Sequence, residues 1–417
     1  GDQDTRKRWD GFKPTSLSLG TVFALAEQSG WVSPWAKARE KKSRKRAPAP
    51  LPMPESAAPA PAAGVSGNGG GNDLPPLQAP AEDAGSPPDR DWPMDLLKKK
   101  GDVSSCLANA ELILSHMDEW RGVVGYDEFA ERTVHRRRVP CDKQSAETGD
   151  WSDHLDDKTT IWLQRQWGVE FSTNIVGKAV EVLARGHRFH PVREALASLP
   201  PWDGIRRNTE WLSDFLGAER TEYTALVGSF FLRGMIKRVM EPGCKFDYCP
   251  VLEGDQGKGK SSVARILSWR WFCDTDLDLS NKDSLLALPG HWVYEIAELG
   301  SLMKAEERKQ KSFLSRQDDE FRPPYGKRLI KVQRQSVFIG TTNEDEYLKD
   351  ATGGRRFWPV MCGDINLEGL LAAREQMFAE ALVDYKAGER CWPTREEELA
   401  LFKPEQAKRG MSEPFEE

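Results

Sequence analysis

The chain has 417 residues, of which 39% are hydrophobic, so it is long enough to form two or three domains with full cores. Its formal net charge at pH 7 is −6. With this charge the chain is not, as a whole, a basic nucleic-acid-binding module, and any contact with nucleic acid must come from local basic patches.

Cysteine usage and hydropathy indicate the cellular compartment. The seven cysteines are scattered and include no C-x-x-C pair, which is typical of reduced thiols. No apolar run reaches the roughly 18 residues that a spanning helix needs, so we expect no membrane contact. The N-terminus lacks the apolar region of a signal peptide. We therefore expect a cytoplasmic protein.

Composition divides the first 92 residues into two parts. Residues 1–46 hold a short helical pattern and then a run from Lys37 to Arg46 with seven basic residues. That run is either a solvated helix end or a contact for nucleic acid. Residues 47–92 are dominated by Pro, Ala and Gly, and such a segment cannot bury enough apolar surface to offset its chain entropy. We expect a disordered linker there.

Helical periodicity dominates residues 93–205, which we predict to be an α-rich accessory domain. Apolar residues recur at helical spacing in three of its segments, 103–120, 151–167 and 174–185. His187 and His190 have the spacing of a metal pair, but without a third ligand a surface turn is the better interpretation. A further helix is predicted over 221–240, and Pro242-Gly243 ends it.

A phosphate-binding loop follows this helix. The residues fit the pattern G-x-x-x-x-G-K-[ST] at every fixed position, after an apolar run and before a helical one. Backbone N–H groups of such a loop surround a phosphate, and the helix N-terminus adds partial positive charge. We expect Lys260 to contact the β- and γ-phosphates of ATP and Ser261 to hold Mg²⁺. The predicted ATP-binding residues are Gly254, Asp255, Gln256, Gly257, Lys258, Gly259, Lys260, Ser261 and Ser262.

Hydrolysis needs an acidic group at a strand end to hold the metal's waters and to polarise the attacking water. Glu295 comes directly after the apolar run 292–294, and Glu298 lies three residues further on. We favour Glu295 for these tasks, holding Mg²⁺ through water, with Glu298 as its partner. The alternative is that both acids start a helix and complement its dipole.

Two later motifs add groups for the γ-phosphate. Asn343 ends a predicted strand, 336–342, and its amide can both donate and accept a hydrogen bond. Arg355 and Arg356 follow a Gly-Gly pair and precede another apolar strand. A cation at such a turn can stabilise the transition state of phosphoryl transfer, often from a neighbouring subunit. A basic surface turn is the alternative for the two arginines.

The segment between these strands resembles a hairpin with a basic, aromatic tip. Tyr325-Gly326-Lys327 suggests the turn, with alternating residues on both sides. Positive charge and an aromatic ring suit the backbone and bases of single-stranded DNA. The predicted DNA-binding residues are Arg322, Tyr325, Lys327, Arg328 and Lys331. An ordinary solvated hairpin is the other interpretation.

Strand and helix signals alternate from 248 to 362, which predicts an α/β fold with a parallel sheet. Five motifs in this segment resemble, in their order, those of the virulence-associated protein E family. They are the P-loop, W-V-Y-E-I-A-E-L, R-P-P-Y-G-K, V-F-I-G-T-T-N and G-R-R-F-W-P-V. The resemblance covers about 155–392. That family belongs with superfamily three helicases and with primase-helicases of phages and integrated islands.

The resemblance implies an AAA+-like ATPase core that works as a ring, usually a hexamer, with ATP between subunits. Arg355 or Arg356 is then expected to reach into the ATP site of the neighbouring subunit, and Asn343 to act as the phosphate sensor. The hairpin around Lys327 is expected to face a central channel and hold one DNA strand. The family's direction of movement along DNA is 3′ to 5′. The acids of the second motif are adjacent in many members but separated here by Ile296-Ala297. The roles of Glu295 and Glu298 therefore stay open.

The resemblance also suggests the domain organisation. Residues 1–46 are similar to the helical module that ends a phage primase region, which implies that a primase-polymerase domain precedes the chain. The expected parts are then this remnant with its basic tail, the linker, the α-rich domain, an ATPase domain over 206–392 and a tail over 393–417. One alternative function is a P-loop ATPase that remodels protein or acts in phage interference without unwinding DNA. Another is a catalytically inactive scaffold that binds DNA or a primase.

Overall fold

The computed structural model describes residues 91–275, 288–297, 307–321, 329–344, 346–348 and 354–410. The chain divides into two compact units at Gly69–Gly70, and all described residues belong to the second. Three predictions, the helical remnant with its basic tail, the linker and the hairpin tip, therefore lie outside the described residues. So does Glu298.

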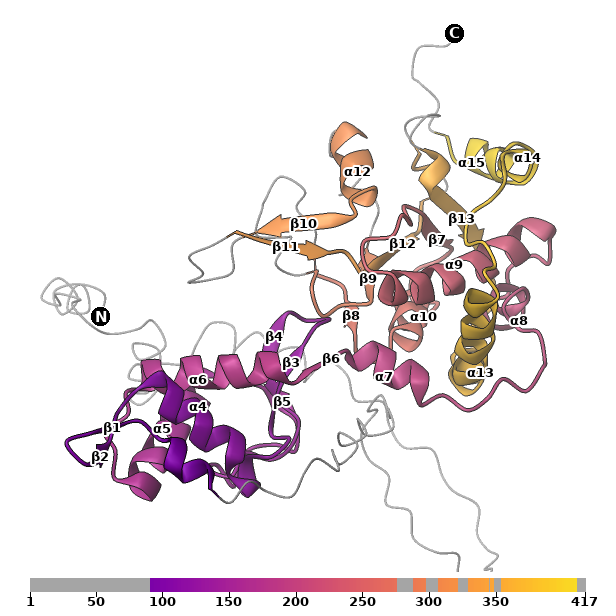
Figure 1. Ribbon diagram of the computed structural model, residues 1–417. Coiled ribbons are helices and arrows are strands. Elements are labelled where there is room, and N and C mark those ends of the chain that lie inside the picture. The colour runs from indigo at the N-terminus through magenta and orange to yellow at the C-terminus, as the bar shows by residue number, and fades with distance from the viewer. Residues whose placement is uncertain are drawn as a thin grey trace, which may run out of the picture. The chain divides into compact units, whose positions relative to one another are not determined.

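A five-stranded parallel sheet forms the centre of the C-terminal part (Figure 1). The strand order is β13-β7-β12-β9-β8, and every neighbouring pair is parallel. This confirms the α/β fold class. The strands are β7 (Cys249–Glu253), β8 (Phe272–Cys273), β9 (Val293–Ile296), β12 (Val337–Thr342) and β13 (Phe357–Met361).

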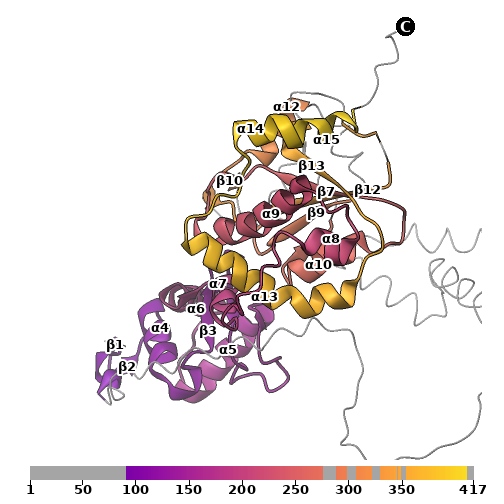
Figure 2. The same ribbon diagram turned by 90° about the vertical axis from the view of Figure 1, so that its right-hand side faces the viewer.

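Helices cover one face of this sheet. Leu252, Val293 and Ile339 point from the strands into one core cluster with three helices: α9 (Glu222–Met240), α10 (Lys260–Leu267) and α13 (Leu367–Lys386). Figure 2 shows α9 and α13 packed beside the short helix α8 (Trp211–Leu216). Buried strands of a parallel sheet are apolar on both faces, and these are too, apart from Glu253, Glu295, Thr341 and Thr342.

The other face carries a smaller cluster. Because successive side chains of a strand alternate, Val251, Tyr294 and Phe338 point away from α10. They pack with Phe313 and Leu314 of α12 (Glu307–Leu314). Directly after α12, strands β10 (Asp318–Phe321) and β11 (Ile330–Gln333) pair antiparallel as a separate two-stranded sheet (Figure 1).

Local sequence explains where the long helices start. The Thr221 hydroxyl accepts from the backbone N–H of Thr224 at 3.1 Å, and the Thr224 hydroxyl accepts from the N–H of Thr221 at 3.0 Å. This reciprocal cap satisfies two N–H groups that would otherwise lack partners at the start of α9. Asn366 caps α13 in the simpler way, accepting from Gly369 N–H at 2.9 Å.

Residues 91–190 combine helices with a small sheet. The helices are α4 (Leu107–His116), α5 (Asp153–Trp167) and α6 (Thr173–Gly186), close to the predicted segments. The sheet, in the order β5-β4-β3-β6, was not predicted. Its strands are β3 (Val124–Asp127), β4 (Arg132–His135), β5 (Gly149–Asp150) and β6 (Arg188–Phe189), each too short to show a periodic pattern.

Short elements complete this part. A two-stranded sheet and two 3₁₀ turns flank α4: η1 (Trp92–Asp95), β1 (Lys98–Lys99), β2 (Asp102–Val103) and η2 (Asp118–Trp120). Helix α7 (Pro191–Ala197) follows β6, and its Val192 and Leu196 belong to the core cluster of α9 and α13. The predicted boundary at 205 therefore comes too late, because α7 already packs in the core of the C-terminal part.

The C-terminal boundary needs a similar correction. We predicted a tail from 393, but residues up to 410 form α14 (Arg395–Glu397), the π-helical turn η5 (Glu398–Phe402) and α15 (Lys403–Ala407). Phe402 is fully buried in the main core, and Gln406 Nε2 donates to Phe357 O on β13 at 3.0 Å. These residues therefore complete the domain.

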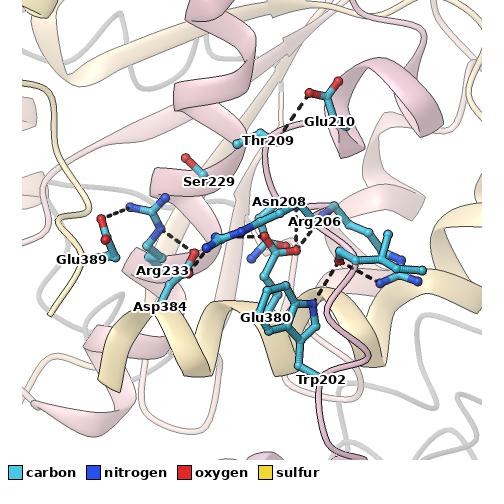
Figure 3. A network of polar contacts seen from close by, with 12 residues as sticks. Trp202, Arg206, Asn208, Thr209, Glu210, Ser229, Arg233, Glu380, Asp384 and Glu389 are labelled. Atoms are coloured by element: carbon cyan, nitrogen blue, oxygen red, sulfur yellow. Dashed lines mark hydrogen bonds and ion pairs between the residues drawn. The ribbon is translucent and has the colours of Figure 1, made fainter. Parts of the chain in front are cut away.

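A buried polar network holds the segment between α7 and α8 in place (Figure 3). Glu380 of α13 is fully buried and accepts hydrogen bonds from the N–H groups of Arg207 at 2.7 Å and Asn208 at 3.1 Å. Arg206 donates to Asp384 at 2.9 Å, and Arg233 of α9 lies 3.3 Å from the same carboxylate. These pairs fix residues 206–208 on α9 and α13. Among the described helices, none is long and apolar enough to cross a membrane.

Candidate nucleotide-binding site

The P-loop connects the carboxyl end of β7 to the first turn of α10. Gly254, Gly257 and Gly259 have φ values of 129°, 86° and 92°, and side chains other than glycine adopt such values only with strain. Gly259 caps α10, and Lys260 is its first residue. The loop glycines thus allow a tight turn in which backbone N–H groups can point toward an anion.

Lys260 is buried at the centre of this loop. Its ammonium donates to the carbonyl oxygens of Gly254 and Asp255, the latter at 2.8 Å, and to Asn343 Oδ1 at 2.8 Å. Burial lowers the pKa of the ammonium. The contact with Asn343 joins two predicted site residues that are far apart in the sequence.

Glu295 lies on β9 with only 2% of its surface exposed. Its Oε1 accepts hydrogen bonds from Ser261 Oγ at 2.6 Å and from Thr341 Oγ1 at 2.8 Å. Its Oε2 is buried and accepts no hydrogen bond from the described residues. A buried carboxylate oxygen without a partner is costly unless a ligand or water uses it.

The strand order explains why these side chains meet. Strand β12 lies between β7, which carries the P-loop, and β9, which carries Glu295. Its last residues therefore reach both neighbours, Thr341 toward Glu295 and Asn343 toward Lys260. The carboxyl ends of parallel strands are where ligands bind in open α/β sheets.

The residues at this edge fit a magnesium ion. Mg²⁺ prefers oxygen ligands and usually keeps several waters, so one hydroxyl, one carboxylate and substrate phosphates are sufficient. Ser261 Oγ and Glu295 Oε2, which has no partner among the described residues, would supply these oxygens. No cluster of three or more His, Cys, Asp or Glu side chains with metal-site geometry exists in the described ranges.

The remaining loop residues face outward. Asp255, Gln256 and Gly257 are exposed, and Lys258 Nζ lies 3.4 Å from Asp255 Oδ2. Ser262 is half-buried in the first turn of α10. The loop is therefore open to solvent on one side while Lys260 is enclosed on the other.

The two arginines of the later motif have different surroundings. Both lie in the 3₁₀ turn η4 (Gly354–Arg356). Arg355 is exposed and makes no ion pair with any described residue, whereas Arg356 Nε donates to Asp247 Oδ2 at 3.1 Å. Arg356 is therefore occupied within its own chain, whereas Arg355 has no carboxylate partner among the described residues.

Strands β10 and β11 flank the predicted hairpin tip. Lys331 is exposed on β11 and its Nζ lies 3.0 Å from Asp318 Oδ2, which raises the pKa of the ammonium. Arg322, Tyr325, Lys327 and Arg328 lie outside the described residues. Of the predicted DNA contacts, the structure therefore places Lys331 alone.

Sequence reasoning missed several residues around the site. Thr341 shares the face of β12 that points to Glu295, and strand alternation from Ile339 could have indicated it. Glu253, the residue before the P-loop, is buried and accepts from Arg409 Nη2 at 2.7 Å. No local signal links Glu253 to a residue 156 positions later.

His190 also differs from its predicted place on a surface turn. It is buried, its Nδ1 accepts from Arg193 N–H at 3.2 Å, and its Nε2 lies 2.6 Å from Gln335 Oε1. Burial lowers the pKa of the imidazole to about 4. His190 is a helix cap in this structure, and His187 is exposed.

Comparison with solved structures gives only remote similarity. An A-form apo structure of the NrS-1 C-terminal region shares 12% identity with a TM-score of 0.38, over 61% of this chain and 64% of that one. A second apo structure of that region has the same identity and TM-score and is covered to 65%. The chain thus spans less than two thirds of these relatives. No curated protein matches the chain.

The family comparison is more informative. The family model of the virulence-associated protein E-like domain matches residues 196–410, which is more than half of the chain. The match begins within α7 and ends after α15, so it coincides with the corrected limits of the C-terminal domain. By its sequence motifs and by this match, the chain belongs to the virulence-associated protein E-like family.

Proposed function

We propose that this protein is an ATP-dependent DNA helicase that moves along single-stranded DNA. One observation supports the ATPase part above all others. Three parallel strands bring Lys260, Ser261, Glu295 and Asn343 together at one edge of the sheet, with contacts of 2.6 and 2.8 Å. Positioned groups of this kind supply most of the catalysis in phosphoryl transfer.

Each residue has a defined role in this proposal. Lys260 leaves the loop carbonyl groups and contacts the β- and γ-phosphates, while Ser261 and Glu295 hold Mg²⁺, which neutralises phosphate charge. Glu295 also polarises the attacking water, and Asn343 contacts the γ-phosphate. The buried environment strengthens each of these electrostatic contacts.

The geometry of η4 supports an ATP site shared between subunits. Phe357, the first residue of β13, pairs with Cys249, the first residue of β7, so Arg355 lies at the amino edge of the sheet. The P-loop lies at the carboxyl edge, about 13 Å of strand away. Arg355 therefore cannot serve its own P-loop, and we propose that it reaches a neighbour's in a ring, as the family resemblance implies.

The hairpin is the proposed contact with DNA. Its described base carries the exposed Lys331, and the sequence places further basic and aromatic residues at its tip. In a hexameric ring these tips would face the channel and move 3′ to 5′ along one strand. A primase-polymerase domain preceding the chain would make the whole a primase-helicase.

Steady-state ATP hydrolysis with and without single-stranded DNA tests the proposal. We expect DNA to stimulate hydrolysis and the protein to displace a strand from a forked duplex. Lys260→Ala should fold normally, by circular dichroism, and lack both activities. A wild-type rate that does not respond to any oligonucleotide would instead favour a protein-remodelling ATPase.

Binding to the DNA backbone gives a second criterion. Contacts with phosphates release counterions, so the affinity for single-stranded DNA should fall steeply as salt rises. Fluorescence anisotropy of a labelled oligonucleotide over a salt series measures this slope. A flat slope would argue against a channel lined by basic hairpins.

A further inference from the structure

The turn η4 carries two arginines. Arg355 makes no ion pair with any described residue, whereas Arg356 contacts two other elements. The side chain of Arg356 is 12% exposed. Its Nε donates to Asp247 Oδ2 at 3.1 Å and its Nη2 donates to Ser315 Oγ at 3.1 Å. Arg356 thus joins η4 to two segments that lie 109 and 41 residues away in the sequence.

Asp247 connects this cluster to the strand of the P-loop. It lies two residues before β7, and only 6% of its surface is exposed. A buried carboxylate is strongly destabilising when its cationic partner is removed. Arg356 and Asp247 are therefore expected to stay together when either segment moves.

Ser315 connects the cluster to the hairpin. It follows the last residue of α12 and precedes β10, and its hydroxyl donates to Lys311 O at 2.7 Å while accepting from Arg356. Its Oγ also lies 3.5 Å from Asp247 Oδ2. A displacement of Arg356 therefore reaches the chain directly before the hairpin.

The base of the hairpin is fixed to the same place. Arg334, one residue after β11, donates to both oxygens of Asp319 on β10, at 2.8 and 2.6 Å, and both side chains are buried. Arg334 Nη1 also donates to Phe313 O in α12. The end of α12 and the two strands of the hairpin therefore move as one body.

We propose that Arg356, Asp247 and Ser315 form a relay that couples ATP binding to the position of the DNA hairpin. When Arg355 contacts the neighbour's γ-phosphate, η4 shifts, and Arg356 carries the shift through Ser315 to the hairpin. This inference depends on the proposed function. Arg356 is then a positioning residue, and Arg355 alone contacts nucleotide.

Coupling between two sites is reciprocal: ATP changes the affinity for DNA by the factor by which DNA changes the affinity for ATP. Both factors can be measured with adenylyl-imidodiphosphate, an ATP analogue that is not hydrolysed. The relay predicts that its disruption lowers both factors together, while each ligand alone still binds.

Ser315→Ala is the main test, because it removes one acceptor of Arg356 and leaves no buried charge unpaired. We expect the wild-type coupling factor to fall by about fivefold or more, toward 1, in both directions. The DNA-free ATPase rate and the midpoint of unfolding should be unchanged. Ser198→Ala is the matched control, since Ser198 also ends a helix and donates only to a local carbonyl, Ala195 O at 2.8 Å.

Arg356→Lys tests the relay from its other end, because lysine keeps the charge beside Asp247 but loses the forked contact. It should reduce the coupling factor in the same way. If both variants keep the wild-type factor, the relay is wrong while the helicase proposal stands. If the wild-type protein shows no coupling between the two ligands, the helicase proposal fails and the relay fails with it.

Discussion

The two carboxylate oxygens of Glu295 have different surroundings, and this difference leads to a prediction. Oε1 accepts from Ser261 and Thr341, whereas Oε2 has no partner among the described residues. Glu295→Gln keeps the shape of the side chain but removes its charge. We expect ATP hydrolysis to fall by about 10²–10⁴-fold, the usual contribution of a positioned base, while nucleotide still binds.

Steady-state hydrolysis and binding of a fluorescent ATP analogue measure the two effects separately. Glu344→Gln is the control, because Glu344 is exposed two residues beyond β12 and should not change the rate. A Glu295→Gln rate within about threefold of wild type would remove Glu295 from catalysis and direct attention to Glu298.

The neighbouring arginines should respond differently to substitution. Arg355→Ala is expected to leave stability unchanged, because the side chain is exposed, and to slow hydrolysis by about 10³-fold. Mixing it with Lys260→Ala protein should restore some activity, since mixed interfaces then pair an intact P-loop with an intact arginine. Absence of rescue at every mixing ratio would contradict an intersubunit site.

Arg356→Ala should instead destabilise the fold. It leaves the buried carboxylate of Asp247 without its cation, which typically costs about 3 kcal/mol or more. Denaturant unfolding of both variants beside wild type measures the difference. Equal stability of the two variants would mean that the ion pair with Asp247 contributes little.

At the residue scale, the sequence predicted the P-loop, Glu295 and Asn343 because each follows a recognisable apolar run. The sequence could not show that Arg355 and Arg356 have different surroundings, because the two arginines are consecutive and belong to the same motif. Their difference depends on Asp247 and Ser315, which adjoin them only in the folded chain.

At the scale of elements, the hairpin can be tested by reversing one charge. Lys327→Glu is expected to weaken binding of single-stranded DNA without changing hydrolysis in the absence of DNA, because Lys327 is not among the residues predicted to bind ATP. Anisotropy titrations and ATPase assays measure both quantities. Unchanged DNA affinity would exclude this hairpin as a DNA contact.

Helix α7 offers a prediction about pH. The pKa of its cap, His190, is about 4 in the folded protein and about 6.5 in an unfolded chain. Between these values the unfolded state binds a proton that the folded state does not, so stability falls as pH falls. From pH 7 to pH 5 the loss should be about 2 kcal/mol from this group.

His190→Asn keeps a capping side chain but does not titrate. Its free energy of unfolding should therefore change less between pH 7 and pH 5 than that of wild type, by about 2 kcal/mol. Urea unfolding at the two pH values provides the comparison. Parallel losses in both proteins would mean that His190 is not protonated on unfolding in this range.

The elements that were predicted are those with a strong local pattern. Helices α5, α6 and α9 show helical periodicity, and strands β7, β9, β12 and β13 coincide with apolar runs in the sequence. Strands β5, β6 and β8 have two residues each and carry no such signal, so pairing with distant neighbours alone defines them.

For the whole molecule, the proposed ATP site between subunits would make activity depend on assembly. Because Arg355 cannot reach its own P-loop, a dilute monomer should hydrolyse ATP slowly. The rate per subunit is expected to rise with protein concentration and then level off when assembly is complete. Hydrolysis over a dilution series, with sedimentation of the same samples, tests this. A constant rate per subunit across the monomer–oligomer transition would contradict it.

The last described residues have a practical consequence for anyone shortening this chain. Arg409 binds Glu253, the residue directly before the P-loop, and Tyr347 donates to the same carboxylate at 2.7 Å. A protein truncated at 392 would lose this guanidinium and uncover the core around Phe402. Removing one partner of a buried ion pair costs about 3–5 kcal/mol. A minimal fragment that still binds nucleotide must therefore extend to residue 410.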